Sequence, residues 1–416
     1  MTDEFEVFIA LAGRDVRVGT LWREPRRGYE ATGFSNDPAW ARAPEGFALE
    51  PALVLSQGAY SPAAGRAMFG SLGDSAPDTW GRRLLQRAER RQAQHDRRPP
   101  RTLYEIDYLI GVADVARVGA LRFRHRGGPS FLAVAPGGVP SVVHLQRLLE
   151  ATERTLRDEE SDEDLRLILA PGSSLGGARP KASVVDRDGS LALAKFPKET
   201  DEYSSERWEA VALTLASDAG IDAARFRLAE IAGRIVVIIR RFDRVDGRRI
   251  PFLSAMSMLE RRDGEQASYP EIVDAIARHG ARAKRDAAEL YRRVAFNVLV
   301  SNVDDHLRNH AFLWKGADGW VLAPAYDLNP TPVDIRERRL TTFIDLADGA
   351  CDIDLLLSSS EWYGLSPADA NSAIREVARV TRRWRAIAAS LGASSSEIER
   401  MSSAFEHHEL ERALSL

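Results

Sequence analysis

The stretch SNVDDHLRNH, residues 301–310, directly follows a long apolar segment and gathers several side chains that can carry chemistry. Asp304 and Asn309 stand in the spacing D-x-x-x-x-N, at which phosphoryl-transfer enzymes place a catalytic aspartate and a metal-binding asparagine. Asp305 leaves one residue fewer before Asn309, so Asp304 is the better candidate for the base. The stretch therefore favours a phosphoryl-transfer loop.

The same stretch allows two other interpretations. His306 and His310 are four residues apart and could share a helix face, as in a zinc protease. That motif needs Glu directly after the first histidine, but Leu307 stands there, and the single cysteine of the chain is Cys351. A dedicated zinc site is therefore disfavoured. Asp304 could also be a helix-capping or turn carboxylate.

Four further features follow the order that a phosphoryl-transfer enzyme requires. The segment GSSLGGARPK, residues 172–181, offers backbone amides for phosphates, Lys195 lies on the next predicted strand, and Glu209 lies on the next predicted helix. Asp327 follows a short strand in APAYDLNP. Mg²⁺ prefers oxygen ligands, which Asn309 and Asp327 can supply without histidine.

Each of these features alone has an ordinary explanation. The glycine-rich segment matches neither the Walker A loop nor G-x-G-x-x-G and could be a connector. Lys195 could be an exposed strand residue, Glu209 a solvated helix residue, and Asp327 the start of a turn. Phosphoryl transfer remains favoured because the ordinary explanations would have to hold for all five features at once.

The composition bounds the class of protein. The chain has 416 residues, 44% of them hydrophobic, and a net charge of −4, so two or three domains are expected and overall charge does not favour nucleic acid. One cysteine excludes an intrachain disulfide and any cysteine-rich zinc site. The sequence has neither a basic, apolar leader nor a membrane-spanning apolar run, so we expect a cytoplasmic protein that does not contact membranes.

Lysine is scarce, with only five lysines among 57 basic residues. Arg and Lys are not interchangeable, so lysines retained in an arginine-rich chain are candidates for specific roles, although codon bias explains most of them. Lys181 and Lys195, which follow the glycine-rich segment, are the two of interest.

Hydrophobic patterning predicts an α+β protein whose C-terminal part is mainly helical. Strands are expected in a hairpin over 5–23, within 117–128, on both sides of the turn at 186–189, and at 235–239. Helices are expected over 74–98, 141–157, 204–221 (ending at Gly220), 270–279, 284–300, 366–391 and 395–413.

Two charged segments stand out. Residues 82–101 carry eight arginines against Glu89 and Asp96, a net charge of +6. A solvated basic helix is the favoured interpretation, with a DNA- or partner-facing patch as the alternative. The run DEESDED, residues 158–164, has too many charges to pack and is expected to form a surface face or loop.

The chain resembles the HipA-type serine/threonine kinase toxins of bacterial type II toxin–antitoxin systems, over nearly its whole length. The segments that carry the resemblance are FGSLGDSAPDTWGRRLL (69–85), DYLIGVADVARVGALRF (107–123), SSLGGARPKA (173–182), LALAKFP (191–197), RRFDR (240–244), NVDDHLRNHAFL (302–313) and LAPAYDLNPTP (322–332). The last two together are the most specific, whereas the RFDR tetrapeptide alone is weak.

The resemblance implies a two-lobed protein-kinase-like fold with an added N-terminal β-rich subdomain. The expected divisions are an N-terminal subdomain over 1–128, a kinase N-lobe over 129–255 with the glycine-rich loop and the ATP lysine, and a helical C-lobe over 256–416 with the catalytic and metal-binding motifs. The chain departs from protein kinases in lacking the H-R-D, D-F-G and A-P-E segments, so its site would be a remote variant of that template.

The resemblance also implies roles for individual residues. Asp304 would be the catalytic base, Asn309 and Asp327 would hold Mg²⁺, and His306 would support the active site, although it could equally be a buried hydrogen-bonding residue. Asp305 would be a further supporting residue, and His310 is expected to be structural. The implied ATP-binding set is Ser174, Gly176, Gly177, Lys181, Lys195, Glu209, Arg241, Phe242 and Asp243.

The family further implies autophosphorylation of a serine in the glycine-rich loop, which corresponds to Ser174 here, with Ser173 as the adjacent alternative. A phosphate adds about −1.5 to −2 charges at neutral pH, which would disfavour ATP beside it. Lys181 and Arg179 are close enough in sequence to pair with that phosphate.

The implied partners are a small DNA-binding antitoxin, operator DNA bound mainly through that antitoxin, and a protein substrate in translation such as an aminoacyl-tRNA synthetase. ATP and Mg²⁺ are the implied cofactors. Two alternatives stay open: a small-molecule kinase of the aminoglycoside or lipid type, and a non-catalytic kinase-fold protein that acts through antitoxin and DNA binding, with residues 82–101 as its contact face.

Overall fold

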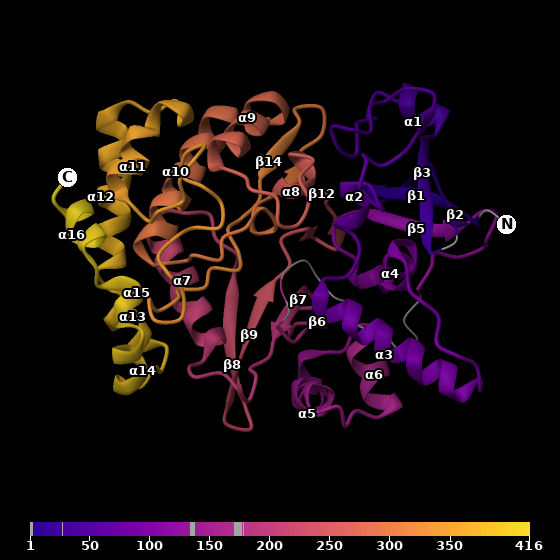
Figure 1. Cartoon of the computed structure of the whole chain (residues 1–416), viewed down its shortest axis with the longest axis horizontal. Coiled ribbons are helices and arrows are strands. Elements are labelled where there is room, and N and C mark those ends of the chain that lie inside the picture. Colours follow the sequence, from indigo (N-terminus) through magenta and orange to yellow (C-terminus); the bar gives the residue numbers. More distant parts are fainter. Residues whose placement is uncertain (1–2, 27, 134–137, 170–176, 178) are drawn as a thin grey trace. The chain divides into compact units, whose positions relative to one another are not determined.

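The computed structural model describes residues 3–26, 28–133, 138–169, 177 and 179–416. Contacts divide the chain into two compact units (Figure 1). The N-terminal unit comprises Met1–Glu199, Ile231–Arg234 and Arg240–Leu253, and the C-terminal unit comprises Thr200–Glu230, Ile235–Ile239 and Ser254–Leu416. Ser174 and Gly176 of the predicted ATP-binding set, and the alternative Ser173, lie outside the described residues.

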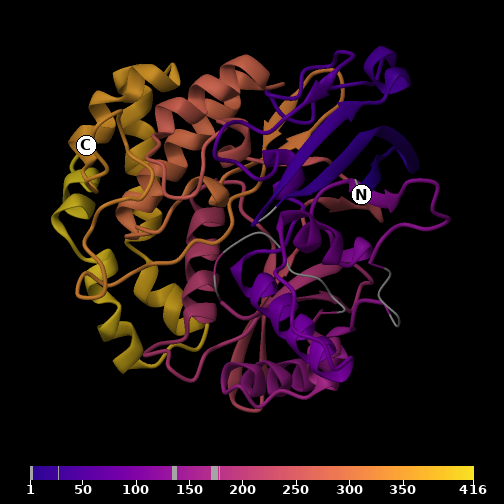
Figure 2. The same cartoon turned by 45° about the vertical axis from the view of Figure 1, so that its right-hand side comes forward.

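The N-terminal unit contains an antiparallel sheet with the strand order β4-β3-β2-β1-β5, whose indigo strands are seen in Figure 2. Its strands are β1 (Asp3–Leu11), β2 (Arg14–Arg26), β3 (Tyr29–Asn36), β4 (Ala59–Tyr60) and β5 (Leu121–His125). The predicted hairpin is confirmed: β1 and β2 pair through a two-residue turn, Ala12–Gly13, in which both residues have positive φ.

The described residues of this unit form six helices, of which the sequence predicts the third and the fifth, over 74–98 and 141–157. They are α1 (Pro38–Arg42), α2 (Gly70–Gly73), α3 (Thr79–His95), α4 (Glu105–Gly111), α5 (Leu145–Leu156) and α6 (Asp162–Leu169), with 3-10 turns at Asp114–Ala116 and Val142–His144. The basic helix α3 begins where it does because the Asp78 side chain accepts a hydrogen bond from the Gly81 N–H at 2.9 Å.

The prediction that residues 158–164 form an exposed face or loop is wrong in part. Helix α6 begins at Asp162, and the side chains of Glu160 and Asp164 are buried. They can be buried because arginines neutralise them: Arg87 of α3 lies 2.9 Å from Glu160, and Arg154 of α5 binds both oxygens of Asp164 at 2.9 and 2.5 Å. Part of the charge on α3 therefore serves the packing of this unit.

A second antiparallel pair follows the glycine-rich segment, as the sequence predicts. Strands β6 (Lys181–Val185) and β7 (Leu191–Lys195) pair in a register that sets Lys181 opposite Lys195. Gly189 has a φ of +79°, which a turn of this kind favours. The short strands β10 (Arg244–Val245), β11 (Arg248–Arg249) and β12 (Phe252–Ser254) come later in the chain.

The C-terminal unit is mainly helical, as predicted (Figure 1). After α7 (Ser205–Asp218) and the neighbouring strands β8 (Phe226–Ile231) and β9 (Arg234–Arg240) come the helices α8 (Ala255–Met258), α9 (Tyr269–His279), α10 (Ala283–Leu299), α11 (Ile353–Ser358), α12 (Pro367–Thr381), α13 (Trp384–Ser390), α14 (Ser395–Arg400), α15 (Ser402–Phe405) and α16 (His408–Leu414). The continuous helices predicted over 366–391 and 395–413 are instead divided into two and three helices.

The core of this unit fixes the start of the candidate site. Helix α10 is buried along most of its last three turns, and the chain then turns at Ser301, a fully buried residue with a φ of +53°. A 3-10 turn at Leu307–Asn309 and the hairpin of β13 (Ala311–Trp314) and β14 (Trp320–Leu322) follow. The loop at 301–310 is thus held between a buried helix and a buried hairpin.

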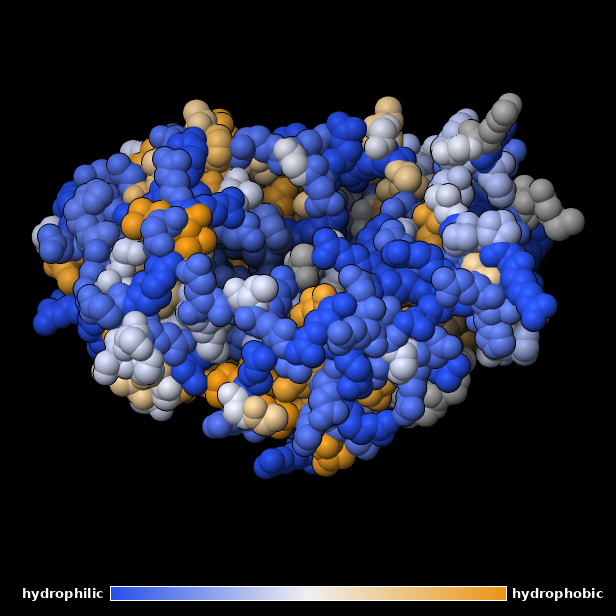
Figure 3. Space-filling model, turned by 60° about the horizontal axis from the view of Figure 1, so that its bottom comes forward, coloured by the Kyte–Doolittle hydropathy of each residue, from blue (hydrophilic) through white to orange (hydrophobic). Residues whose placement is uncertain are grey.

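The hydropathy of one face of the molecule is typical of a globular protein. The face seen in Figure 3 is largely hydrophilic, with scattered hydrophobic side chains. Within the described ranges, no helix combines enough length and apolar character to cross a bilayer.

Candidate functional site

The site is built around Asp304, whose main chain is held on both sides. Thr341 donates its N–H and its hydroxyl to the Val303 carbonyl at 3.1 and 3.0 Å, and Thr342 does the same to the Asp305 carbonyl at 3.1 and 2.7 Å. Val303 and Asp305 are buried, whereas the Asp304 side chain is 63% exposed. The loop is therefore rigid where it presents this carboxylate to solvent.

The Asp304 carboxylate uses one of its two oxygens in protein contacts. Its Oδ1 accepts a hydrogen bond from Arg336 Nη1 at 2.6 Å, and its Oδ2 has no partner among the described residues. The Asp304 side chain does not cap the 3-10 turn that follows, because the N-cap there is His306. An exposed carboxylate with a free oxygen can accept a proton from an incoming hydroxyl.

The structure brings Asn309 to Asp304, as the spacing predicts. The Asn309 side-chain Nδ2 donates to the Asp304 carbonyl at 3.3 Å, which fixes the orientation of the amide. Its Oδ1 is buried and has no hydrogen-bond partner among the described residues. An acceptor without a partner in a buried place is costly, and a cation would satisfy it.

The buried Asp305 side chain anchors the loop to the interior of the C-terminal unit. Its Oδ2 accepts hydrogen bonds from Tyr269 at 2.5 Å, from Asn297 at 2.8 Å and from His310 at 2.7 Å, with all four side chains buried. Burial together with the nearby Asp305 raises the pKa of Tyr269 well above its usual value. His310 is therefore occupied by a structural contact. The Nδ1 atoms of His306 and His310 are both buried without a hydrogen-bond partner among the described residues, and the supporting role of His306 stays a prediction.

Asp327 is the second predicted metal ligand. It has a φ of +57°, a conformation that costs a non-glycine residue about 1 kcal/mol and that clusters at functional sites. Asn329 Nδ2 donates to the carboxylate and to the carbonyl of Asp327, both at 3.1 Å. Tyr326 donates its hydroxyl to the Arg308 carbonyl at 2.5 Å, which ties this segment to the residue before Asn309.

Three asparagines that the sequence analysis did not single out connect these parts. Asn302 donates to Asn297 Oδ1 at 3.0 Å and accepts from the Asn329 N–H at 2.9 Å. The chain of contacts runs from the Asp305 anchor through Asn297 and Asn302 to Asn329 and the Asp327 carboxylate. Asn297 within the apolar run of α10 is the signal that could have revealed it, because a buried polar side chain needs a partner.

The two lysines that the sequence predicts to bind ATP, Lys181 and Lys195, are buried in the N-terminal unit. Lys195 is 8% exposed, so its interpretation as an exposed strand residue is wrong. Directly opposite residues of an antiparallel pair share a face, which places Lys195 beside Lys181. Lys181 Nζ donates to Asp78 at 2.7 Å and to the Gly177 carbonyl at 3.3 Å. In the C-terminal unit Glu209 is also buried, so it is not a solvated helix residue; the predicted pairing of Lys195 with Glu209 stays a prediction.

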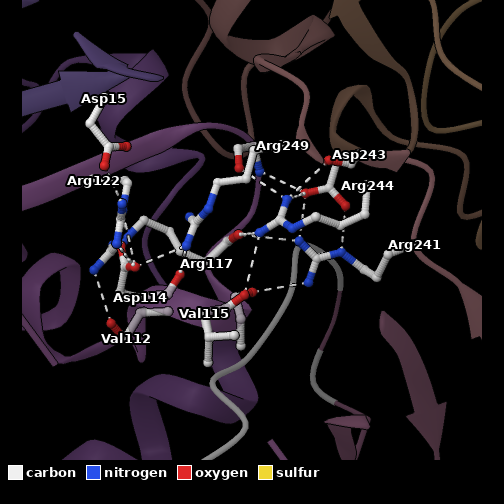
Figure 4. Close-up of polar contacts among 12 residues, drawn as sticks. Asp15, Val112, Asp114, Val115, Arg117, Arg122, Arg241, Asp243, Arg244 and Arg249 are labelled. Atoms are coloured by element: carbon white, nitrogen blue, oxygen red, sulfur yellow. Dashed lines mark hydrogen bonds and ion pairs between the residues drawn. The ribbon is translucent and has the colours of Figure 1, made fainter. Parts of the chain in front are cut away.

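The RFDR segment forms ion pairs within itself, drawn in Figure 4, and hydrogen bonds to backbone groups of the N-terminal subdomain. Arg241 binds both oxygens of Asp243 at 2.6 and 2.5 Å, and Arg244 binds one of them at 2.7 Å. Burial acts to raise the pKa of Asp243, but Arg241 and Arg244 hold it well below its usual range. Arg241 also donates to the Ala116 carbonyl at 3.0 Å, and Asp243 accepts from the Gly119 N–H at 2.8 Å.

These contacts anchor the exit of β9 to the 3-10 turn at Asp114–Ala116. The side chain of Phe242, between the two charged residues, stacks on Phe252 with ring centroids 6.4 Å apart. Nucleotide contacts of Arg241, Phe242 and Asp243 stay predictions, and the described contacts show in addition that Arg241 and Asp243 are structural.

Comparison with known proteins gives relatives that carry kinase names. A Sinorhizobium fredii protein named "Putative kinase Y4mE" is 30% identical over 184 residues, which are 38% of this chain and 42% of that protein. A Haemophilus influenzae protein named "Putative kinase" is 27% identical over 181 residues, which are 38% of this chain and 52% of that protein. The chain thus spans about half the length of the curated relatives that it matches.

Among solved structures, the chain is similar to one from the Shewanella oneidensis MR-1 toxin–antitoxin complex of HipA, HipB and operator DNA. The TM-score is 0.65 at 17% sequence identity, and the match covers 99% of this chain and 96% of that chain. This likeness confirms the fold: α+β and protein-kinase-like, with a β-rich N-terminal region and a mainly helical C-terminal region.

The family model of the HipA-like C-terminal domain matches residues 173–384, just over half of the chain. The match includes Lys195, Glu209, Asp304, Asn309 and Asp327, the residues whose order first indicated phosphoryl transfer. The chain belongs to the HipA-like family.

Proposed function

We propose that this protein is an ATP- and Mg²⁺-dependent serine/threonine protein kinase that acts as the toxin of a toxin–antitoxin system. The observation that carries the proposal is the presentation of Asp304: its main chain is held on both sides, its Oδ2 has no partner among the described residues, and Asn309 is bound to its carbonyl. In this chemistry the protein contributes mainly position and charge, so a rigid carboxylate is the feature required.

Asp304 would orient the acceptor hydroxyl and accept its proton through Oδ2. Asn309 Oδ1 and the Asp327 carboxylate would hold Mg²⁺, because both are oxygen donors and the Asn309 oxygen lacks any other partner among the described residues. Mg²⁺ held there would offset negative charge on the nucleotide phosphates. His306, beside the base, would support the loop.

Lys195 would bind the ATP phosphates with its buried ammonium group, and Glu209 would orient it. The glycine-rich loop, including Gly176 and Gly177, would lie over the nucleotide, with Arg241, Phe242 and Asp243 at its other side. Ser174 would be the autophosphorylated residue that lowers ATP binding. Because Lys181 is held by Asp78, a phosphate on that loop would compete with Asp78 for it.

The partners are proposed from the resemblance and from the Shewanella structure, which contains HipB and operator DNA. We propose a small DNA-binding antitoxin, operator DNA bound mainly through it, and a cytoplasmic substrate in translation such as an aminoacyl-tRNA synthetase.

The test incubates the full chain with MgATP and locates phosphate by mass spectrometry, with Asp304→Asn as the inactive variant. Asp318→Asn is the matched control, since Asp318 is an exposed turn carboxylate outside the site. We expect phosphate on Ser174 or Ser173 in the unsubstituted chain and in the control, and none in Asp304→Asn. Absence of MgATP binding would refute the kinase, and transfer to an aminoglycoside instead of protein would favour the small-molecule alternative.

A further inference from the structure

Arg336 contacts the candidate base from a segment far along the chain. Its Nη1 donates to Asp304 Oδ1 at 2.6 Å, and its Nη2 donates to Thr341 Oγ1 at 3.0 Å. That same Thr341 hydroxyl donates to the Val303 carbonyl at 3.0 Å. The guanidinium is therefore braced against the residue that holds the main chain before Asp304.

Arg336 supplies this contact although another arginine is nearer in sequence. Arg308 lies in the same loop as Asp304, but its Nε and Nη2 bind the two oxygens of Asp263 at 3.0 and 2.9 Å. A bidentate pair uses the guanidinium in a fixed direction. The positive charge bound to Asp304 thus comes from the later segment.

The ion pair between Asp304 and Arg336 contributes little to the stability of the fold. The Asp304 and Arg336 side chains are 63% and 44% exposed, and exposed ion pairs contribute little to the free energy of folding. The geometry matters more for reactivity, because occupation of Oδ1 leaves Oδ2 as the oxygen that can receive a proton. Arg336 also keeps N–H donors without a partner among the described residues, since the guanidinium has five N–H groups and these two contacts use two of them.

We propose that Arg336 is a positioning residue for phosphoryl transfer; this inference rests on the proposed function. The acceptor oxygen forms a bond to the γ-phosphorus while the bond from that phosphorus to the β–γ bridging oxygen breaks, and the electron pair leaves on ADP. The acceptor proton goes to Asp304 Oδ2. Arg336 holds the carboxylate so that Oδ2 faces the hydroxyl, which fixes the direction from which the proton is received.

The experiment compares Arg336→Gln and Arg336→Lys with Arg339→Gln in the full chain. Arg339 is a matched control, because it lies in the same segment, is also 44% exposed, and makes an exposed ion pair with Asp348 at 2.8 Å. Single-turnover transfer from radiolabelled MgATP, to the chain itself and to casein as a general acceptor, gives the rate. Calorimetry gives the Kd for MgATP, and thermal unfolding gives the Tm.

We expect Arg336→Gln to slow single-turnover transfer at least tenfold with Kd and Tm unchanged, Arg336→Lys to recover part of the rate, and Arg339→Gln to match the unsubstituted chain. An unchanged transfer rate in Arg336→Gln, or an equal loss of rate in Arg339→Gln, would overturn the proposed role of Arg336 and leave the proposed function standing. If the unsubstituted chain neither binds MgATP nor transfers phosphate, the proposed function fails and this role fails with it.

Discussion

His310 Nε2 lies 2.7 Å from Asp305 Oδ2, and both side chains are buried. The histidine that resembles a metal ligand in the sequence thus belongs to the support of the loop. The neighbouring carboxylates Asp304 and Asp305 have opposite surroundings, one exposed and one at the centre of a buried hydrogen-bond network. We therefore propose that Asp304 serves the chemistry, whereas Asp305 serves the stability of the loop.

Replacing Asp305 should mainly affect stability. Asp305→Ala leaves the buried polar groups of Tyr269, Asn297 and His310 without their common acceptor, and we expect a loss of about 3 kcal/mol in the free energy of unfolding. Urea denaturation followed by fluorescence measures it. Asp318→Ala should change the value by less than about 0.5 kcal/mol. A loss below about 1 kcal/mol for Asp305→Ala would show that the network is not an anchor.

Removing the Asn302 side chain should make the position of Asp327, the proposed Mg²⁺ ligand, less well fixed, while the Asp327 carboxylate itself remains. Asn302→Ala breaks the contacts to Asn297 and Asn329, so the Asp327 segment loses its link to the Asp305 anchor. We expect a severalfold rise in the Mg²⁺ concentration that gives half-maximal phosphoryl transfer. Asn371→Ala, at a half-buried position of α12, is the control. An unchanged Mg²⁺ dependence would show that Asn302 does not support the proposed Mg²⁺ site.

Lys195 should contribute to nucleotide affinity. Lys195→Met keeps the volume of the buried side chain and removes its charge, and we expect the Kd for MgATP to rise at least tenfold. Calorimetric titration of the full chain measures this. Lys315→Met removes an exposed lysine of the β13–β14 turn and should leave the Kd as it is. Equal Kd values for both variants would exclude Lys195 from the phosphate site.

Glu50 should make stability depend on pH. Burial raises the pKa of Glu50 to about 7 although the Ser71 N–H donates to its carboxylate. The folded protein then binds this proton more tightly than the unfolded chain, so the stability present at low pH is lost as pH rises from about 4.5 to 7, by about 3 kcal/mol.

Glu50→Gln keeps an acceptor for Ser71 and has no proton to lose, so it should flatten this dependence and be more stable than the unsubstituted chain at pH about 8. Urea denaturation across this range is the measurement. Glu45→Gln, an exposed position nearby, should retain the original profile. If Glu50→Gln retained it too, another group would have to carry the dependence.

Local patterns in the sequence were enough to predict much of the fold and the order of the site. The hairpin of β1 and β2, the pair β6–β7 and the helices α7, α9 and α10 follow from side-chain periodicity and turn residues, which act over a few positions. The spacing of Asp304 and Asn309 is local too, and the structure brings them into contact. Such features survive folding because neighbours in sequence remain neighbours in space.

Contacts between distant segments could be decided only by the tertiary structure. Arg336 reaches Asp304 across 32 residues, Thr341 reaches Val303 across 38, and Arg87 neutralises Glu160 across 73. No periodicity encodes them, because they depend on where each loop is carried by the packed core. For the same reason the sequence could identify the carboxylates at 304 and 305 but not their environments, which separate the exposed candidate base from its buried anchor.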